Sequence, residues 1–420
     1  MTAMLKRAAD MIDGVAPIEM MGLMDVHASA HAEEVGPGVA CIESFSNVVA
    51  CDTGGEGLVL FDVSHQLFAP GAIDKLRGWS SAPVHTAVLT HGHIDHVTGA
   101  AAFEAEAAPR QIRFVAHANV EARFDRYKKT GGYNGIINQR QFRLPEPRWP
   151  SEFRTPDLSY QSSLLLEVGG ARFDLHHARG ETDDHTWAWL PQAKAVVVGD
   201  LFIWQFPNAG NPQKAQRYAW DWAVALREMM KLQPELLLPA HGPPIGGQDR
   251  IAHVLGDTAR ALESLHEQVL AMMNAGARLN DVIHTVRLPD ELAHRPWLKA
   301  TYDEPEFVVR NLWRLYGGWY DGNPASLKPA RDTDLAKELA NLAGGAEVLA
   351  RRAERLAGDG ELRLACHLAE MAALAAPDAP MVHAVRATVF ELRRDAESSF
   401  MATGIFGAAA ADSRAKADGS

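Results

Sequence analysis

Three histidines and one aspartate crowd the segment THGHIDHVTG, directly after a short apolar run. Imidazoles and carboxylates this close together need a metal ion, a proton-transfer task or open solvent. On an extended segment, residues two apart project to the same side, so His91 and His93 can reach one ion. Asp95 and His96, at the start of the helix expected next, turn toward a second ion. The spacing therefore predicts two neighbouring metal sites.

Further metal ligands are expected where other apolar strands end. Glu181 in ARGETDDHTW, Asp200 in VVVGDLF and His241 in LLPAHGPP each stand at such a place. Loops gather at strand ends in α/β proteins and carry their functional residues. Taken singly, Glu181 or Asp200 could equally be a capping or surface residue. Taken together with the histidine cluster, the three residues favour a binuclear metal centre.

Strands and helices alternate around these residues. We expect short strands and a hairpin turn over 40–65, further strands at 84–90, 111–116, 162–178, 185–191, 194–200 and 234–242, and helices at 68–79, 97–107, 118–129 and 219–232. This alternation predicts a mixed sheet covered by helices. Residues 130–156 are rich in Gly, Pro, Asn and Arg and lack periodicity, so we expect an active-site loop there.

Beyond residue 247 the pattern changes to helices alone. Apolar residues recur at helical spacing, and residues 346–397 read as three helices separated by the breakers GDG and APDAP. We therefore expect two domains, an α/β domain over residues 1–250 and an all-helical domain over residues 251–420.

Composition limits the partners and the location. The 41 Lys and Arg against 53 Asp and Glu give a net charge of -12 without a basic stripe, so we expect no nucleic-acid partner. Three scattered cysteines do not make a disulfide framework. Charges and a proline interrupt the first residues, and no long apolar run follows. We therefore expect no secretory signal, no membrane partner and a cytoplasmic location.

The histidine cluster also carries a family resemblance. THGHIDHVTG resembles the HxHxDH signature of the metallo-β-lactamase superfamily, with Asp62 in LVLFDVSH before it and Asp200 and His241 after it. The resemblance implies an αββα sandwich that holds one or two metal ions, most often zinc, at the edge between its sheets.

A second resemblance lies in the helical region. The stretch VRNLWRLYGGWYDGNPASLKPA and the helices after it are similar to the dimerisation domain of the linear alkylsulfatases. In that family the third metal-binding motif carries Glu, which Glu181 matches here. The resemblance covers roughly residues 47–397 and implies a homodimer formed through an α-helical alkylsulfatase-type domain.

The resemblance also implies a role for each ligand. His91, His93 and Glu181 would hold one ion, Asp95, His96 and His241 the other, and Asp200 would bridge the two. Both ions are expected to be Zn²⁺, and a hydroxide shared between them would be the nucleophile. Asp95 and Asp200 are therefore our candidate catalytic residues. Asp62 would orient a ligand histidine.

A small alkyl sulfate ester is the substrate that the resemblance implies. Pro212 stands where the family has its sulfate-binding arginine, so another cation must replace that arginine or the substrate carries less charge. The candidate substrate-binding residues are Tyr133, Asn134, Asn138, Arg140, Lys214 and Arg217. A metallohydrolase of another ester, lactone or thioester is the alternative. A non-catalytic scaffold is disfavoured, because a scaffold needs no complete ligand set.

Overall fold

The computed structural model describes residues 1–19 and 30–419 of the 420-residue chain. These residues form two compact units, each with its own apolar core. The first unit comprises residues 1–131, 150–277 and 281–318, and the second comprises residues 132–149, 278–280 and 319–420.

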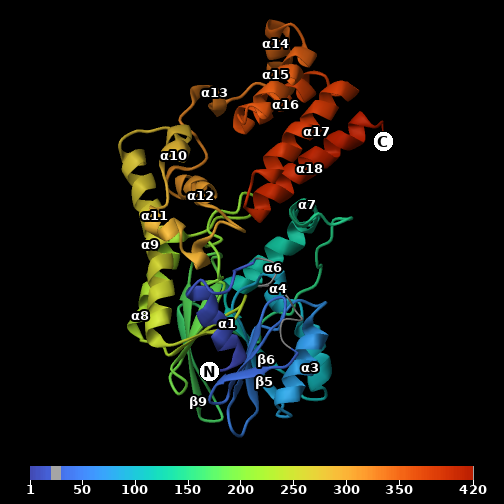
Figure 1. The fold of residues 1–420 in the computed structure, drawn as a ribbon. Coiled ribbons are helices and arrows are strands. Elements are labelled where there is room, and N and C mark those ends of the chain that lie inside the picture. Colours follow the sequence, from blue (N-terminus) through green and yellow to red (C-terminus); the bar gives the residue numbers. More distant parts are fainter. Residues whose placement is uncertain (20–29, 420) are drawn as a thin grey trace. The chain divides into compact units, whose positions relative to one another are not determined.

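Two β-sheets form the centre of the first unit (Figure 1). The first sheet contains, in order, β1 (Glu33–Gly36), β2 (Val39–Ile42), β3 (Val48–Asp52), β4 (Leu58–Phe61), β5 (Val84–Leu89), β6 (Arg113–His117) and β7 (Leu158–Tyr160). Its strands pair antiparallel from β1 to β4 and parallel from β4 to β7. Strand β4 is buried and apolar throughout, as expected of a strand covered on both faces, whereas β5 and β6 include polar residues such as Thr86 and Arg113.

The second sheet is mostly antiparallel. It contains, in order, β13 (Ile245–Gly246), β12 (Leu236–Pro239), β11 (Ala195–Gly199), β10 (His185–Leu190), β9 (Ala171–Ala178) and β8 (Ser163–Val168). Only β11 and β12 pair in parallel. The ends of β11 and β12 therefore lie at the same edge of this sheet.

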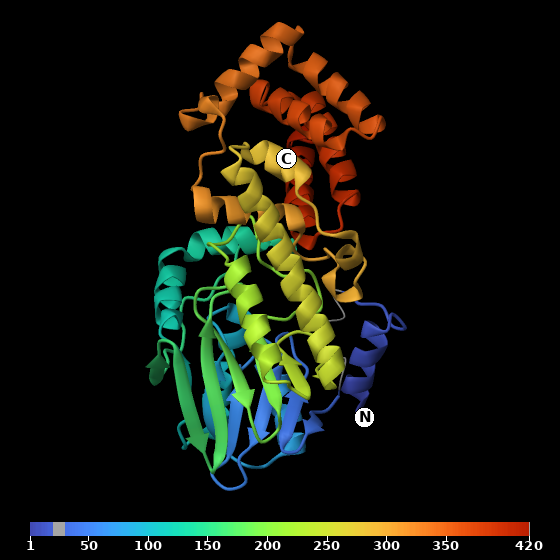
Figure 2. The same ribbon diagram turned by 90° about the vertical axis from the view of Figure 1, so that its left-hand side faces the viewer.

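Apolar side chains fill the space between the two sheets. Phe61 and Val88 of the first sheet share one buried cluster with Phe173 and Leu238 of the second. Helices cover the outer faces: α3 (Ala69–Trp79), α5 (Ala100–Ala107) and α6 (Asn119–Lys129) on the first sheet, and α8 (Ala219–Lys231) and α9 (Gln248–Asn274) on the second (Figure 2). The predicted αββα sandwich is confirmed.

Short helices complete the first unit. They are α1 (Ala3–Ile12), α4 (Ile94–Val97), α10 (Leu279–Thr285), α11 (Asp290–Ala293), a 3₁₀ turn at Pro296–Leu298 and α12 (Pro305–Gly317). Among the described residues, no helix is both long and apolar enough to cross a membrane.

The second unit is helical, as predicted. Its helices are α7 (Gly131–Phe142), α13 (Pro324–Leu327), α14 (Asp332–Ala343), α15 (Ala346–Gly358), α16 (Leu362–Ala375), α17 (Pro380–Asp395) and α18 (Phe400–Ala417). The core between them is built largely from alanines, including Ala350, Ala365, Ala369 and Ala372. Small side chains let neighbouring helices approach closely, and α15 is followed by a turn that contains Gly360, which has a φ of 85°.

The prediction of a loop over residues 130–156 is wrong for its first half, where the chain forms α7. The ring of Phe142 packs on that of Phe400 with the centroids 5.5 Å apart, and Arg143 donates a hydrogen bond to the carbonyl of Thr403. At Gly404, an added Cβ would lie 2.5 Å from the carbonyl oxygen of Gln141. Close packing on α18 therefore stabilises a helix that the local composition does not predict.

The two units do not divide the chain at residue 250. The long helix α9 packs along α8 and belongs to the first unit, which continues to Gly318. The division into domains 1–250 and 251–420 stays a prediction, because compact units and domains need not share boundaries.

Candidate metal centre

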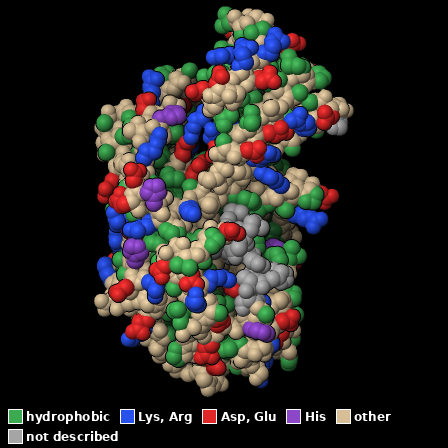
Figure 3. Space-filling view, viewed as in Figure 1, with side chains coloured by type: hydrophobic (Ala, Val, Ile, Leu, Met, Phe, Trp, Pro, Cys, Tyr) green, Lys and Arg blue, Asp and Glu red, His purple; other side chains and the backbone are tan. Residues whose placement is uncertain are grey.

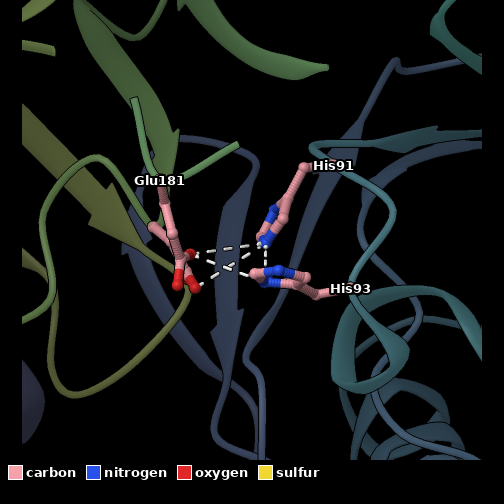
Figure 4. A group of neighbouring side chains, drawn as sticks. His91, His93 and Glu181 are labelled. Atoms are coloured by element: carbon pink, nitrogen blue, oxygen red, sulfur yellow. Dashed lines mark hydrogen bonds and ion pairs between the residues drawn. The ribbon is translucent and has the colours of Figure 1, made fainter. Parts of the chain in front are cut away.

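The histidine cluster begins where the buried strand β5 ends. His91 is fully buried, and its Nε2 lies 2.8 Å from Nδ1 of His93. His93 is the N-cap residue of α4, so the chain changes from extended to helical at this point. The two imidazoles thus face each other from residues two apart, as the extended segment predicts (Figure 4).

Two carboxylates from the second sheet approach these imidazoles. Glu181 lies between β9 and β10, and Asp200 directly follows β11. Nε2 of His91 is 3.7 Å from Oε2 of Glu181 and 3.7 Å from Oδ2 of Asp200. Nδ1 of His93 is 3.5 Å from the same Glu181 oxygen. These four residues form a group that could hold one metal ion.

A second group lies beside the first. Oδ2 of Asp95 is 3.4 Å from Nε2 of His96 and 3.3 Å from Nε2 of His241. The other Asp200 oxygen, Oδ1, is 3.5 Å from each of these two nitrogens. Asp200 therefore directs one carboxylate oxygen at each group. All seven residues expected from the sequence lie in these two groups.

The residues present fit divalent metal ions. Oε2 of Glu181, Oδ1 of Asp200 and Nε2 of His96 are buried and have no hydrogen-bond partner among the described residues. Burying such atoms without a partner is costly. Imidazole and carboxylate donors are the ligands that zinc and similar ions take. Bound cations would satisfy these atoms.

The electrostatics of the group are strongly perturbed. Burial acts to raise the pKa of Asp200, but the imidazoles of His96 and His241 outweigh it and hold the pKa well below its usual range. Burial raises the pKa of Glu181, the Arg217 guanidinium opposes the rise, and the Asp200 carboxylate adds to it. Two neighbouring buried carboxyl groups thus have pKa values that are shifted in opposite directions. Such perturbed pKa values are typical of a functional site.

Asp62 contacts the second group from behind. Its Oδ2 is 2.8 Å from Nδ1 of His96, and its two oxygens accept hydrogen bonds from the amide and the hydroxyl of Thr90. Asp62 has a φ of 61°, an uncommon conformation outside glycine. The contact leaves Nε2 of His96 facing Asp95 and Asp200, as expected of a residue that orients a ligand.

Arg217 is engaged with Glu181. Its Nη1 donates to Oε1 of Glu181 at 2.6 Å and to the carbonyl of Asn208 at 2.6 Å, and Arg217 is only 3% exposed. The amide of Asn208 also donates to Glu181 Oε1. Burial lowers the pKa of Lys214 to about 8, and Arg217 lowers it while Glu181 and Asp95 raise it. The first group therefore lies close to two cationic side chains.

The remaining candidate substrate residues lie elsewhere in the chain. Tyr133, Asn134, Asn138 and Arg140 are all on α7, which belongs to the second unit. Asn134 and Asn138 are buried there, whereas Tyr133 is exposed. Their assignment to a substrate pocket stays a prediction.

Sequence analysis missed other residues beside the centre. Nε2 of His185 accepts a hydrogen bond from the amide of Asp200 at 3.1 Å, and its ring stacks on that of His91. Burial lowers the pKa of His185 to about 4, so its ring is neutral and can accept this bond. The run of two aspartates and a histidine after Glu181 could have drawn attention to His185. No sequence pattern marks Asn208, which contacts Glu181 only in the folded chain.

The sandwich and the site at its edge define a class of protein. Residues 42–241 match the model of the metallo-beta-lactamase superfamily, and residues 278–416 match the model of alkyl sulfatase dimerisation. The chain is an alkylsulfatase-like protein of the metallo-β-lactamase superfamily.

Two curated relatives illustrate this similarity. A linear primary-alkylsulfatase of Pseudomonas sp. (strain ATCC 19151) is 25% identical over 318 residues, which are 69% of this chain and 59% of the relative. An (R)-specific secondary-alkylsulfatase of Pseudomonas sp. is 24% identical over 367 residues, 80% of this chain and 55% of the relative. This chain therefore spans less than two thirds of the length of either relative.

A solved structure shares the fold. The stereoselective inverting sec-alkylsulfatase Pisa1 from Pseudomonas sp. superposes with a TM-score of 0.82 at 22% identity. The match covers 93% of this chain and 66% of that one. The agreement concerns the fold of both regions, sandwich and helices.

Proposed function

We propose that this chain is a binuclear metal-dependent hydrolase that acts on a small alkyl sulfate ester. The observation that carries the proposal is the position of Asp200, whose two oxygens lie within 3.7 Å of imidazoles in both groups. The curated relatives, which are alkylsulfatases, support the choice of substrate.

The ligand roles follow from the two groups. His91, His93 and Glu181 would hold one ion, Asp95, His96 and His241 would hold the other, and Asp200 would serve both. Two divalent ions, here proposed to be Zn²⁺, supply Lewis-acid activation of water and stabilise developing negative charge. Asp95 and Asp200 are the proposed catalytic residues, because Asp200 directs one oxygen at each group and Asp95 contacts both imidazoles of the second group. Asp62 keeps His96 in orientation through the 2.8 Å contact.

Lys214 is the cation that we assign to the sulfate group. The guanidinium of Arg217 already forms a buried ion pair with Glu181, so it positions this proposed ligand rather than the substrate. A pKa of about 8 keeps Lys214 largely protonated at neutral pH. Lysine provides a point charge for an anionic group rather than a bidentate grip.

The commitment of Arg217 also supports a second candidate function. A substrate with less charge than a sulfate ester, such as a carboxylic ester, lactone or thioester, needs no arginine in the pocket. The same two groups would serve its hydrolysis.

A homodimer is the assembly that we propose. Helix α14 exposes Leu335, Leu339 and Leu342, which are 48%, 38% and 77% exposed and lie along one side at helical spacing. The match of residues 278–416 to the alkyl sulfatase dimerisation model supports a second copy as the partner of this face.

The location and the other partners complete the proposal. Cys41, Cys51 and Cys366 are all free, which supports a reducing compartment such as the cytoplasm. Basic and acidic side chains are interspersed on the face in Figure 3, and the net charge is -12, so we propose no nucleic-acid partner.

A hydrolysis screen tests the function. The purified chain, supplied with Zn²⁺ or Mn²⁺, is incubated with alkyl sulfates of increasing length and, in parallel, with carboxylic esters, lactones and thioesters. We expect release of inorganic sulfate that stops on chelation and returns with the ion. Turnover of a carboxylic ester without any sulfate release would replace the first candidate by the second. A chain that binds no metal would refute both.

A further inference from the structure

A buried ion pair outside the ligand set joins two of the loops that carry ligands. Arg123 lies on α6 and is 5% exposed, and Asp184 is fully buried. Nε of Arg123 donates to Oδ2 of Asp184 at 2.6 Å, and its Nη2 donates to Asp183. Burial acts to raise the pKa of Asp184, but the Arg123 guanidinium outweighs it and holds the pKa well below its usual range.

The same Asp184 oxygen also holds the histidine loop. It accepts a hydrogen bond from the amide of Gly92 at 3.1 Å. Gly92 is the residue between His91 and His93, so this bond fixes the backbone from which both imidazoles project. Packing here is tight, because a Cβ added at Gly92 would lie 2.7 Å from Cδ of Arg123 and 3.1 Å from Oδ2 of Asp184.

Asp184 lies in the same loop as Glu181, so its hydrogen bond to Gly92 connects two ligand-bearing loops. Asp184 is three residues after Glu181, so one carboxylate is anchored in the Glu181 loop and bonded to the backbone of the histidine loop. Arg123, from a helix on the outer face of the sheet, neutralises that carboxylate and limits its movement. The two loops supply three of the four residues of the first group.

We propose that Arg123 and Asp184 are positioning residues that set the separation of the His91–His93 loop and the Glu181 loop, and thereby the metal affinity of the first group. The inference rests on the proposed binuclear centre. Neither Arg123 nor Asp184 hydrogen-bonds to a residue of the Asp95, His96 and His241 group in the described part of the chain; instead they bond to each other, to Asp183 and to Gly92. The pair should therefore act on one ion and leave the other unchanged.

Metal titration in single-site backgrounds tests this inference. His241→Ala leaves the first group intact, and His91→Ala leaves the second intact. In each background the apoprotein is titrated with Zn²⁺ against a chromogenic chelator. In the His241→Ala background, Asp184→Asn and Arg123→Met should weaken Zn²⁺ binding about 10- to 100-fold, the usual effect of losing a partner behind the ligands. In the His91→Ala background neither change should alter the affinity.

Controls separate positioning from a general loss of structure. Lys129→Met, an exposed change on the same helix, should leave both affinities unchanged. Arg123→Lys keeps the charge and should recover part of the lost affinity. Far-UV circular dichroism and thermal unfolding show whether each variant is folded. If Arg123→Met does not fold, the Zn²⁺ titration is made with Arg123→Lys instead.

The outcomes distinguish the inference from the function on which it rests. Unchanged affinity of the first group in the Asp184 and Arg123 variants, or equal weakening of both groups, overturns the inference alone. A wild-type chain that binds no Zn²⁺ overturns the proposed function, and the inference with it.

Discussion

The two units of the molecule fill their interiors in opposite ways. The first buries charged side chains such as Glu181, Arg217 and Asp303 among large apolar residues. Within the described part of the second unit, no Asp, Glu, Lys or Arg is buried, and alanines form much of the core. A buried charge is costly unless it is partnered, and the described part of the second unit avoids that cost while it exposes leucines such as Leu339. The contrast fits the chemistry that we propose for the first unit and the association that we propose for the second.

Asp200→Ala should have the largest effect, because it removes a carboxylate that faces both ligand groups. We expect the bound metal to fall well below two equivalents. Sulfate release should fall about 1,000-fold, equivalent to about 4 kcal/mol of transition-state stabilisation. Metal analysis and an activity assay measure the two effects. Asp125→Ala, an exposed residue on α6, is the control and should change neither. Full metal content in Asp200→Ala would contradict the shared role.

Arg217→Met tests whether the buried charges of the first unit depend on one another. The variant leaves the Glu181 carboxylate buried beside Asp200 without its guanidinium partner. Losing the buried hydrogen bonds of this pair should lower the free energy of unfolding of the metal-free chain by about 1–3 kcal/mol, because Glu181, whose pKa burial already raises, can take up a proton. Urea unfolding measures it. Arg172→Met, which breaks the pair with Asp174 at the surface, should have a much smaller effect. Equal effects would show that burial does not matter here.

Asp303 gives the first unit a distinctive pH dependence. Burial raises the pKa of Asp303 to about 6, although its carboxylate accepts hydrogen bonds from the amides of Gly210 and Glu304. In the unfolded chain its pKa is about 3.9, so the folded state disfavours the charged form. This residue should therefore reduce stability as pH rises from about 4 to 6, by up to about 3 kcal/mol.

The measurement for Asp303 is a series of unfolding curves between pH 4 and 7, compared with Asp303→Asn. The variant cannot ionise, so the difference in stability between the two proteins should change across this range and level off above about pH 6. A constant difference at every pH would mean that Asp303 has an ordinary pKa in the folded chain.

Leu339→Asp tests the outer face of the second unit. If a second copy covers this face, a charge in place of a buried leucine should cost about 1.5–3 kcal/mol of association, roughly a 10- to 100-fold weaker dimer. Light scattering at several concentrations should then show more of the 45.8 kDa monomer. Leu165→Asp changes a leucine that is 51% exposed in the first unit and should leave the mass unchanged. If Leu165→Asp lowered the mass and Leu339→Asp did not, the contact between copies would involve the first unit and the proposal would be wrong.

Local patterns predicted most of the fold. Alternating strands and amphipathic helices predicted both the sandwich and the helical region, since the apolar residues recur with the period of each kind of element. Helix α7 escaped prediction because Gly132, Asn134 and Gly135 favour no helix, and its stability comes from packing on α18, some 260 residues later in the chain. Tertiary contacts of this kind leave no periodic signal.

The candidate site divides in the same way. Its seven proposed ligands stand at strand ends and in a compact motif, so residue type and position were enough to name them. The contacts behind them link residues far apart in sequence, such as Arg123 with Asp184 and Gly210 with Asp303. Each partner alone looks like an ordinary surface charge or loop glycine. Only the folded chain shows which charges are buried together.

The segment at residues 132–149 has a practical consequence for dissecting the protein. The second unit is assembled from separate stretches, so no single cut in the gene yields it intact. A fragment that begins at residue 319 would lack α7, the helix against which Phe400 and Gly404 pack. Conversely, a fragment that ends at residue 318 would keep α7 but deprive it of α18. Recombining this helical unit with another catalytic sandwich would require grafting residues 132–149 along with the C-terminal helices.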